Sequence, residues 1–87
     1  MTNFRIQITS KAQKDLKKLH PAIRKRITTA ILSLEISRYP RQSKYLKGDA
    51  IAQFRLRVGG YRVLYDVYDD DAVVLILRIG HRKDIYR

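Results

Sequence analysis

The chain reads FRLRVGGYRVLY from residue 54 to residue 65, and this stretch decides the fold. Apolar and polar side chains alternate on both sides of Gly59 and Gly60, which is typical of two strands with one buried face. Two glycines between such strands form a common hairpin turn. This turn sets the register, because Val58 then pairs with Tyr61. The stretch therefore predicts an antiparallel β-hairpin.

The same register predicts a cluster of arginines on one face of the hairpin. Arg57 pairs with Arg62, and Arg55 lies on the same face opposite Leu64. Like charges that face one another destabilise a sheet, whereas guanidinium groups hold phosphate oxygens in fixed geometry. We therefore interpret the cluster as an anion site. The simpler alternative is the solvated face of an amphipathic sheet. The other face is expected to pack on helices through Phe54, Leu56, Val58, Val63 and Tyr65.

The segments before the hairpin predict one strand and two helices. Apolar residues alternate over residues 4–8, as in a strand with one buried face. A first helix is expected to start at Thr9 or Ser10, because Ser10 and Gln13 have the spacing of a capping box. A second helix is expected from Pro21, with an apolar stripe that ends before Pro40. The two helices should form a hairpin packed on the sheet.

The segments around the hairpin complete an α+β domain. Residues 39–50 are expected to form a basic loop, and residues 73–79 a nearly continuous apolar strand at the centre of the sheet. Gly80 is expected to end that strand. The predicted order is an N-terminal strand, a helical hairpin and a three-stranded antiparallel meander, β-α-α-β-β-β, in a single domain over residues 1–87.

The charge of the chain indicates an anionic partner. Nineteen Lys and Arg against eight Asp and Glu give a formal net charge of +11, with an isoelectric point near 10.4. A charge of this size on a small domain is typical of proteins that bind nucleic acid, an anionic membrane surface or an acidic protein. Apolar residues make up 45% of the chain, which is enough for a core.

Composition also limits the chemistry. The chain has no cysteine and two histidines, so we expect no disulfide, no thiol catalysis, no metal site and no cofactor. The longest apolar run, residues 72–77, is far shorter than the ~20 residues of a membrane-spanning helix. The N-terminus has no apolar stretch typical of a secretory signal. We therefore expect a cytoplasmic protein without a membrane partner.

Other basic residues extend the candidate site. The predicted loop carries Lys44 and Lys47, and the chain after the last strand carries His81, Arg82 and Tyr86. His81 has two interpretations, an acid or base near neutral pH and a partly exposed residue at a strand end. Tyr86 has three: its ring stacks on an unpaired base, its hydroxyl is activated by the positive field, or it packs on the sheet edge.

The chain resembles the RelE family of bacterial and archaeal toxins, within the wider RelE/ParE superfamily. The resemblance covers nearly the whole chain. It is carried by the hairpin stretch 54–65, by residues 12–19 and 45–48, and most specifically by Gly-Tyr-Arg at 60–62 followed by Gly-His-Arg at 80–82 and a late tyrosine.

The resemblance implies a ribosome-dependent endoribonuclease that cuts mRNA in the A site. In that family the ribose 2′-hydroxyl attacks the phosphate without a metal, and an acidic antitoxin binds the toxin in a hetero-oligomer. Matching by motif, Arg55 falls where the family has a catalytic lysine, Arg62 and Arg82 fall on catalytic arginines, and Tyr86 falls on the late tyrosine. The further residues expected to contact RNA are Lys44, Lys47, Arg57, Arg78 and His81.

Two departures from the family leave alternatives open. A second catalytic lysine of the best-known members falls at Gln53, so the proton acceptor is unassigned, with Lys47 and His81 as substitutes. The chain ends one residue beyond Tyr86, without the C-terminal helix of some relatives. The alternative functions are a DNA gyrase poison of the ParE type, which shares the fold, a non-catalytic protein that binds RNA or ribosomes, and an inactive toxin relative.

Overall fold

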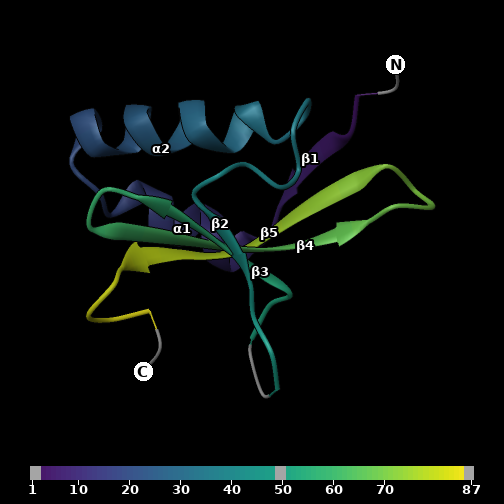
Figure 1. Ribbon diagram of the computed structural model, residues 1–87. Coiled ribbons are helices and arrows are strands. Elements are labelled where there is room, and N and C mark those ends of the chain that lie inside the picture. The colour runs from purple at the N-terminus through teal and green to yellow at the C-terminus, as the bar shows by residue number, and fades with distance from the viewer. Residues whose placement is uncertain (1–2, 49–50, 86–87) are drawn as a thin grey trace.

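In a computed structural model, which describes residues 3–48 and 51–85, two helices cover one face of a five-stranded sheet (Figure 1). The elements are β1 (Arg5–Ile8), α1 (Ser10–Lys17), α2 (Pro21–Ser33), β2 (Ser43–Tyr45), β3 (Phe54–Val58), β4 (Tyr61–Tyr68) and β5 (Val73–His81). The predicted α+β class and the β-α-α-β-β-β order are confirmed, with the short strand β2 in addition.

The strand order in the sheet is β1-β5-β4-β3-β2, with β1 parallel to β5 and every other pair antiparallel. The central position predicted for the last strand is confirmed, because β5 lies between β1 and β4. The register predicted from the two glycines is confirmed as well: Val58 pairs with Tyr61 and Arg57 with Arg62.

Two predicted boundaries in the second half of the chain are wrong. Part of the expected loop 39–50 forms β2, whose three residues pair with Leu56, Arg55 and Phe54 of β3. This edge strand is largely exposed, so it lacks the apolar alternation by which strands are recognised. Strand β5 also continues through Gly80, which pairs with Arg62. Ile85 packs on this position, because a Cβ atom there would lie 3.7 Å from the Ile85 Cβ, an ordinary van der Waals distance.

Helix α1 starts at Ser10, as predicted, but it is capped differently from the Ser10–Gln13 spacing expected. Thr9 is the N-cap, and its hydroxyl oxygen accepts a hydrogen bond from the Ala12 N–H at 3.1 Å. The Gln13 side chain donates to the Ile8 carbonyl at 3.0 Å instead of completing a capping box with Ser10. The Thr9 hydroxyl also donates to the Leu77 carbonyl of β5, so the cap ties the helix to the sheet.

The main core lies between the helices and the sheet. Ile27, Ile31 and Leu34 of α2 and its C-cap are buried against residues of β3, β4 and β5. The hairpin residues predicted for this core, Phe54, Leu56, Val58, Val63 and Tyr65, all belong to it. The helical hairpin therefore packs on the face that the alternation predicted. Neither helix is long and apolar enough to cross a membrane, within the residues described.

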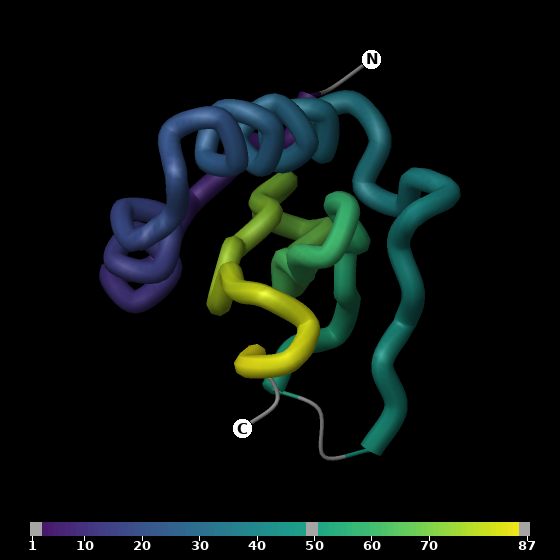
Figure 2. Tube along the Cα trace, turned by 90° about the vertical axis from the view of Figure 1, so that its left-hand side faces the viewer, coloured from purple at the N-terminus to yellow at the C-terminus, as the bar shows by residue number. Residues whose placement is uncertain are grey.

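A second, smaller core lies on the opposite face of the sheet. Ala52, Leu64 and Ile85 are buried there, with Leu46 and Leu77 packed against them. The segment between β2 and β3 and the turn after β5 both lie on this side, away from the helices (Figures 1 and 2). The turn is closed by the Ile85 N–H, which donates to the His81 carbonyl at 3.1 Å. The face that carries the arginines is therefore partly covered.

Candidate functional site

Basic residues occupy two neighbouring rows across this second face. In one row Lys44, Arg55, Leu64 and Arg78 follow one another on β2, β3, β4 and β5. In the next row Arg57 lies opposite Arg62, which lies opposite Gly80. Two residues along a strand separate the rows, which corresponds to about 7 Å. The cluster predicted from the hairpin register is confirmed as a juxtaposition of cations.

Arg62 is the most enclosed of these cations. Its exposed fraction is 9%, and its Nη1 donates to the carbonyls of Gly59 at 3.2 Å and Tyr61 at 3.0 Å. These bonds hold the guanidinium at the hairpin turn. Because the surroundings are less polar than water, a cation fixed here exerts a stronger field than an exposed one. Arg62 therefore forms the rigid part of the site.

The cations beside Arg62 are more accessible. Arg57 and Lys44 are exposed, and Arg55 is half-buried. The Arg55 Nε is buried and makes no hydrogen bond to any described residue. An unsatisfied buried donor is costly, so this Nε is available to a water molecule or a bound anion. This geometry suits an anion that approaches from the face of β3.

Arg78 is directed away from the cluster. Its Nε donates to Oδ2 of Asp15 on α1 at 3.0 Å, and the two side chains form an ion pair. The same carboxylate oxygen accepts the Ile79 N–H at 3.0 Å. Although Arg78 begins on the arginine face, its guanidinium is therefore held at the sheet edge. It adds less charge to the site than the sequence suggests.

His81 lies on the other face of the sheet. It pairs with Tyr61, two pairs beyond Val63 and Ile79 and therefore on the same face, and both of those residues are in the main core. Its ring meets the Tyr61 ring edge-to-face at 5.4 Å between centroids, and its Nδ1 accepts the Lys83 N–H at 3.2 Å. His81 lines a hollow with Arg78, but it does not share the face of Arg55, Arg57 and Arg62, because nearness in sequence does not decide the face.

The turn after β5 brings Arg82 to the hairpin. The Arg82 N–H donates to the Gly60 carbonyl at 3.0 Å, and the side chain is exposed. Arg82 is thus held at the end of the molecule that carries Arg57 and Arg62. Lys47 is exposed in the segment after β2. Tyr86 lies outside the described residues.

Gln53 has a structural role in the sheet. Its backbone N–H donates to Oδ1 of Asp66 at 2.7 Å, and its side-chain oxygen accepts the Val67 N–H at 2.9 Å. These bonds join the start of β3 to β4. Gln53 thus takes part in holding the sheet, at the position where the resemblance expected a catalytic lysine.

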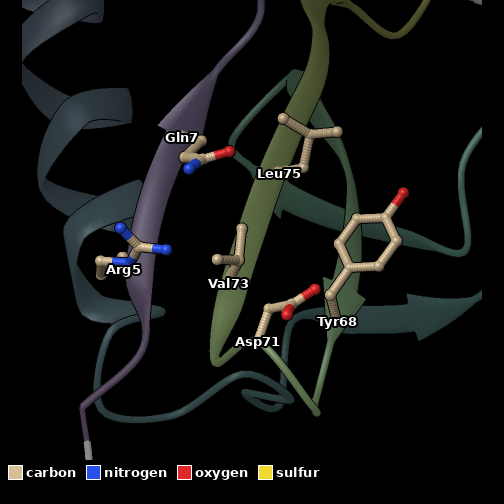
Figure 3. Close-up of a pocket in the computed structure, with 6 residues that line it drawn as sticks. All are labelled: Arg5, Gln7, Tyr68, Asp71, Val73 and Leu75. Carbon is tan, nitrogen blue, oxygen red and sulfur yellow. The ribbon is translucent and has the colours of Figure 1, made fainter.

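A hollow of about 350 Å³ lies at the opposite end of the sheet (Figure 3). Arg5 and Gln7 of β1 line one side, and Tyr68 and Asp71 line the other. None of the candidate residues lines it, and its charges are mixed. Among the residues that the structure describes, no group of three or more His, Asp or Glu is placed to hold a metal ion.

Arg26 escaped the sequence analysis. It is an exposed residue of α2, outside the apolar stripe, and its guanidinium lies against Gly59 of the hairpin turn. No spacing in the sequence joins these two residues. The contact depends on how α2 crosses the sheet.

Comparison with known proteins identifies close relatives. The family model for the ParE toxin of type II toxin–antitoxin systems, parDE, matches residues 6–86. Toxin RelG of Mycobacterium tuberculosis is 39% identical over 88 residues, which cover 97% of each chain. The putative toxin RelE1 of Methanocaldococcus jannaschii is 33% identical, over 97% of this chain and 96% of that protein.

Solved structures show the same fold. The toxin–antitoxin complex RelBE2 of M. tuberculosis contains a chain that matches with a TM-score of 0.82 and 32% identity, over 92% of this chain and 99% of that one. The archaeal RelE–RelB complex of Pyrococcus horikoshii matches with a TM-score of 0.80 and 32% identity, over 97% and 99%.

Proposed function

Because the chain belongs to the RelE/ParE family of type II toxin–antitoxin toxins, we propose that it is an endoribonuclease that cleaves mRNA in the ribosomal A site. The observation that carries the proposal is the Arg57–Arg62 pair, with Arg55 in the neighbouring row. Opposed like charges destabilise a sheet, and a bound phosphate removes that cost. The proposed activity on the ribosome requires a cytoplasmic protein.

In this proposal the nucleophile belongs to the RNA. The 2′-hydroxyl oxygen attacks the neighbouring phosphorus while its proton passes to a base, and the bond from phosphorus to the 5′-oxygen breaks as that oxygen gains a proton. The products are a 2′,3′-cyclic phosphate and a 5′-hydroxyl. Negative charge grows on the phosphate oxygens, and fixed cations that match this charge lower the barrier.

Arg55, Arg62 and Arg82 supply those cations. A guanidinium has a pKa above ~12 and is a poor proton donor, so their role is electrostatic. Tyr86 orients the base or helps to activate the 2′-hydroxyl. Lys44, Lys47 and Arg57 bind the neighbouring backbone. His81 faces away from the arginines, so it takes no part in proton transfer here.

We also propose an acidic antitoxin as the partner. Relatives have been solved as complexes of toxin and antitoxin. With a net charge of +11, this chain attracts an acidic segment that folds on binding and covers the arginine face. The expected assembly is a toxin–antitoxin hetero-oligomer.

One observation favours a second candidate function. The matching family model is that of ParE toxins, and the resemblance to that branch implies poisoning of DNA gyrase. The two candidates differ in substrate, so one assay separates them. A gyrase poison leaves RNA intact and causes gyrase-dependent DNA breaks.

The test uses the purified chain with programmed ribosomes. We expect mRNA to be cut in the A site, in the presence of EDTA, with an upstream fragment that ends in a 2′,3′-cyclic or 3′-phosphate. An mRNA with a single 2′-deoxy sugar at the cleavage position is the matched control and should stay intact. Equal cleavage of the deoxy substrate would contradict 2′-hydroxyl attack. Intact mRNA together with gyrase-dependent DNA breaks would favour the second candidate.

A further inference from the structure

A groove of about 390 Å³ lies between α2 and the edge of β3, next to the arginine face. Strand β2 begins at Ser43, and just before it the Gln42 carbonyl accepts the Arg57 N–H at 3.1 Å, so Pro40 and Gln42 form the outer side of the groove. The volume is at the lower end of the range for ligand sites, ~300–1,000 Å³. Its lining residues are Arg26, Thr29, Ala30, Ser33, Pro40, Gln42, Leu56, Arg57, Val58 and Gly59.

Arg26 is held flat against the hairpin turn at one end of this groove. A Cβ atom on Gly59 would lie 3.1 Å from Nη1 of Arg26 and 3.4 Å from both Cζ and Nη2. Because these three atoms are almost equally close, the guanidinium plane faces the Gly59 backbone. Its N–H bonds lie in that plane and point outward. Arg26 makes no ion pair or side-chain hydrogen bond with any described residue.

The groove is cationic and has no acidic lining residue. Thr29 and Ser33 donate their hydroxyl hydrogens to carbonyls of α2 at 3.0 Å and 2.6 Å. The charged residues in the lining are Arg26 and, at the edge shared with the arginine face, Arg57. Such a pair suits an oxyanion, and a phosphate can accept from both.

Arg57 belongs to both this groove and the arginine face. A strand with one phosphate at Arg62 passes Arg57 and continues around the β3 edge to Arg26. We propose that the groove binds the RNA backbone next to the cleaved phosphate, with Arg26 as the contact. The inference rests on the proposed function and deepens it, because it assigns the path of the substrate beyond the site of cleavage.

Direct binding of a non-cleavable RNA tests this assignment. The probe is a single-stranded RNA with every 2′-hydroxyl methylated, titrated at about 50 to 200 mM salt. Arg26→Ala should weaken binding about tenfold, as expected for one lost charge-assisted contact. The slope of log affinity against log salt should fall by about 0.7, the value for one phosphate on a single strand. Arg5→Ala removes another exposed arginine, at the far end of the sheet, and should change neither quantity.

A second variant separates charge from packing. Arg26→Lys keeps the charge but cannot lie flat on Gly59, so it should keep the salt slope that Arg26→Ala loses. In cleavage assays on ribosomes, the loss in Arg26→Ala should appear in KM rather than in kcat.

Three outcomes would overturn the inference. The first is that Arg26→Ala and Arg5→Ala bind the RNA with the same affinity. The second is that Arg26→Lys and Arg26→Ala lose the same part of the salt slope. The third is that Arg26→Ala binds RNA normally and has lost affinity only for an acidic antitoxin peptide. If the wild type still cleaves mRNA on ribosomes while one of these outcomes is observed, the groove assignment is wrong and the proposed function is unaffected. Conversely, the expected RNA binding without cleavage by the wild type supports the groove and contradicts the nuclease.

Discussion

Arg62 combines two roles that usually belong to different residues. Its Nη1 bonds to Gly59 and Tyr61 hold the hairpin turn, and its charge lies in the second row of the arginine face. An exposed arginine loses entropy when it binds a phosphate, whereas Arg62 is already fixed. Pre-organised charge of this kind often contributes most to catalysis.

We expect Arg62→Ala to reduce the rate of mRNA cleavage by roughly 10²-fold or more, because fixed charge at the developing phosphate anion is lost. Arg62→Lys should recover part of the rate, since a lysine keeps the charge without the fork. Single-turnover assays on programmed ribosomes measure both, and circular dichroism checks the fold. An unchanged rate in well-folded Arg62→Ala would exclude it from the mechanism.

Tyr65 is a residue of the core with a titratable group. Its ring stacks on Phe54 with centroids 5.4 Å apart, and its hydroxyl donates to the Arg38 carbonyl at 2.7 Å. Burial raises the pKa of this hydroxyl above its usual value, and nearby Tyr39 acts in the same direction, while a hydrogen bond with Ser43 opposes them.

This raised pKa predicts a loss of stability at alkaline pH. Above about pH 10 the unfolded chain releases the Tyr65 proton while the folded chain keeps it, so the free energy of unfolding falls as pH rises. Tyr65→Phe should be less stable by about 1 kcal/mol at neutral pH, because one hydrogen bond is lost. It should also decline less between about pH 9 and 11. Urea denaturation of both proteins across this range measures the difference. Parallel declines would contradict the assignment.

At the scale of elements, side chains in and next to α1 form hydrogen bonds with the backbone groups at the edge of β5 that β1 leaves unpaired. Strand β1 pairs with β5 only as far as Ile76. Beyond this point Thr9 bonds to the Leu77 carbonyl and Asp15 accepts the Ile79 N–H. Backbone groups at a sheet edge need such partners when they are buried. The end of β5 that leads to Arg82 is therefore positioned from α1.

We expect Asp15→Ala to lower the free energy of unfolding by about 2 kcal/mol, since it leaves the Ile79 N–H and the Arg78 guanidinium without their acceptor. Asp15→Asn keeps one acceptor and should cost about half as much. Urea denaturation gives both values. Asp70→Ala, in the exposed turn between β4 and β5, is the control and should stay within about 0.5 kcal/mol of the wild type. A similar small change for Asp15→Ala would show that the edge does not depend on it.

The sequence predicted those elements whose signal is local. The register of β3 and β4 follows from two adjacent glycines and strict alternation, and the structure confirms it pair by pair. Strand β2 has no such signal, because its three residues, two of them exposed, form a strand only by pairing with β3. Gly80 was expected to end β5, but a central strand tolerates a glycine when another side chain, here Ile85, packs on it.

The candidate site, too, was predictable only where it depends on a local sequence signal. The opposed arginines were found, because they depend on one hairpin register. The face of His81, the ion pair of Arg78 and the approach of Arg26 to Gly59 depend on contacts between elements far apart in sequence. A single sequence contains no periodicity that reports such contacts.

On the scale of the whole molecule, the charge excess is the dominant property. Four accessible cations lie in the two arginine rows or beside the hairpin turn, namely Lys44, Arg55, Arg57 and Arg82, and they set a lower bound on the phosphate contacts, to which Lys47, Arg62 and Arg26 would add. Each phosphate neutralised on a single strand contributes about 0.7 to the dependence of log affinity on log salt. Four contacts give a slope of about −2.8.

The affinity of the chain for RNA or for programmed ribosomes should therefore fall roughly 50-fold between about 50 and 200 mM salt. Filter binding or fluorescence anisotropy at several salt concentrations measures the slope. Because the slope counts neutralised phosphates, a Lys44→Ala variant should reduce it by about 0.7. An affinity that does not change over this range would contradict binding of a polyanion.

The acidic turn between β4 and β5 makes the charge distribution of the molecule asymmetric, so the molecule orients in an electric field. Asp69, Asp70 and Asp71 are exposed there, and Asp66 lies just before them on β4. This turn and the hairpin turn lie at opposite ends of the sheet (Figure 1). A nearby polyanion repels the aspartates and attracts the arginines, so it exerts a torque on the tumbling protein. The protein is rotated before contact, with the hairpin end foremost, and a larger share of diffusional encounters begins in the productive orientation.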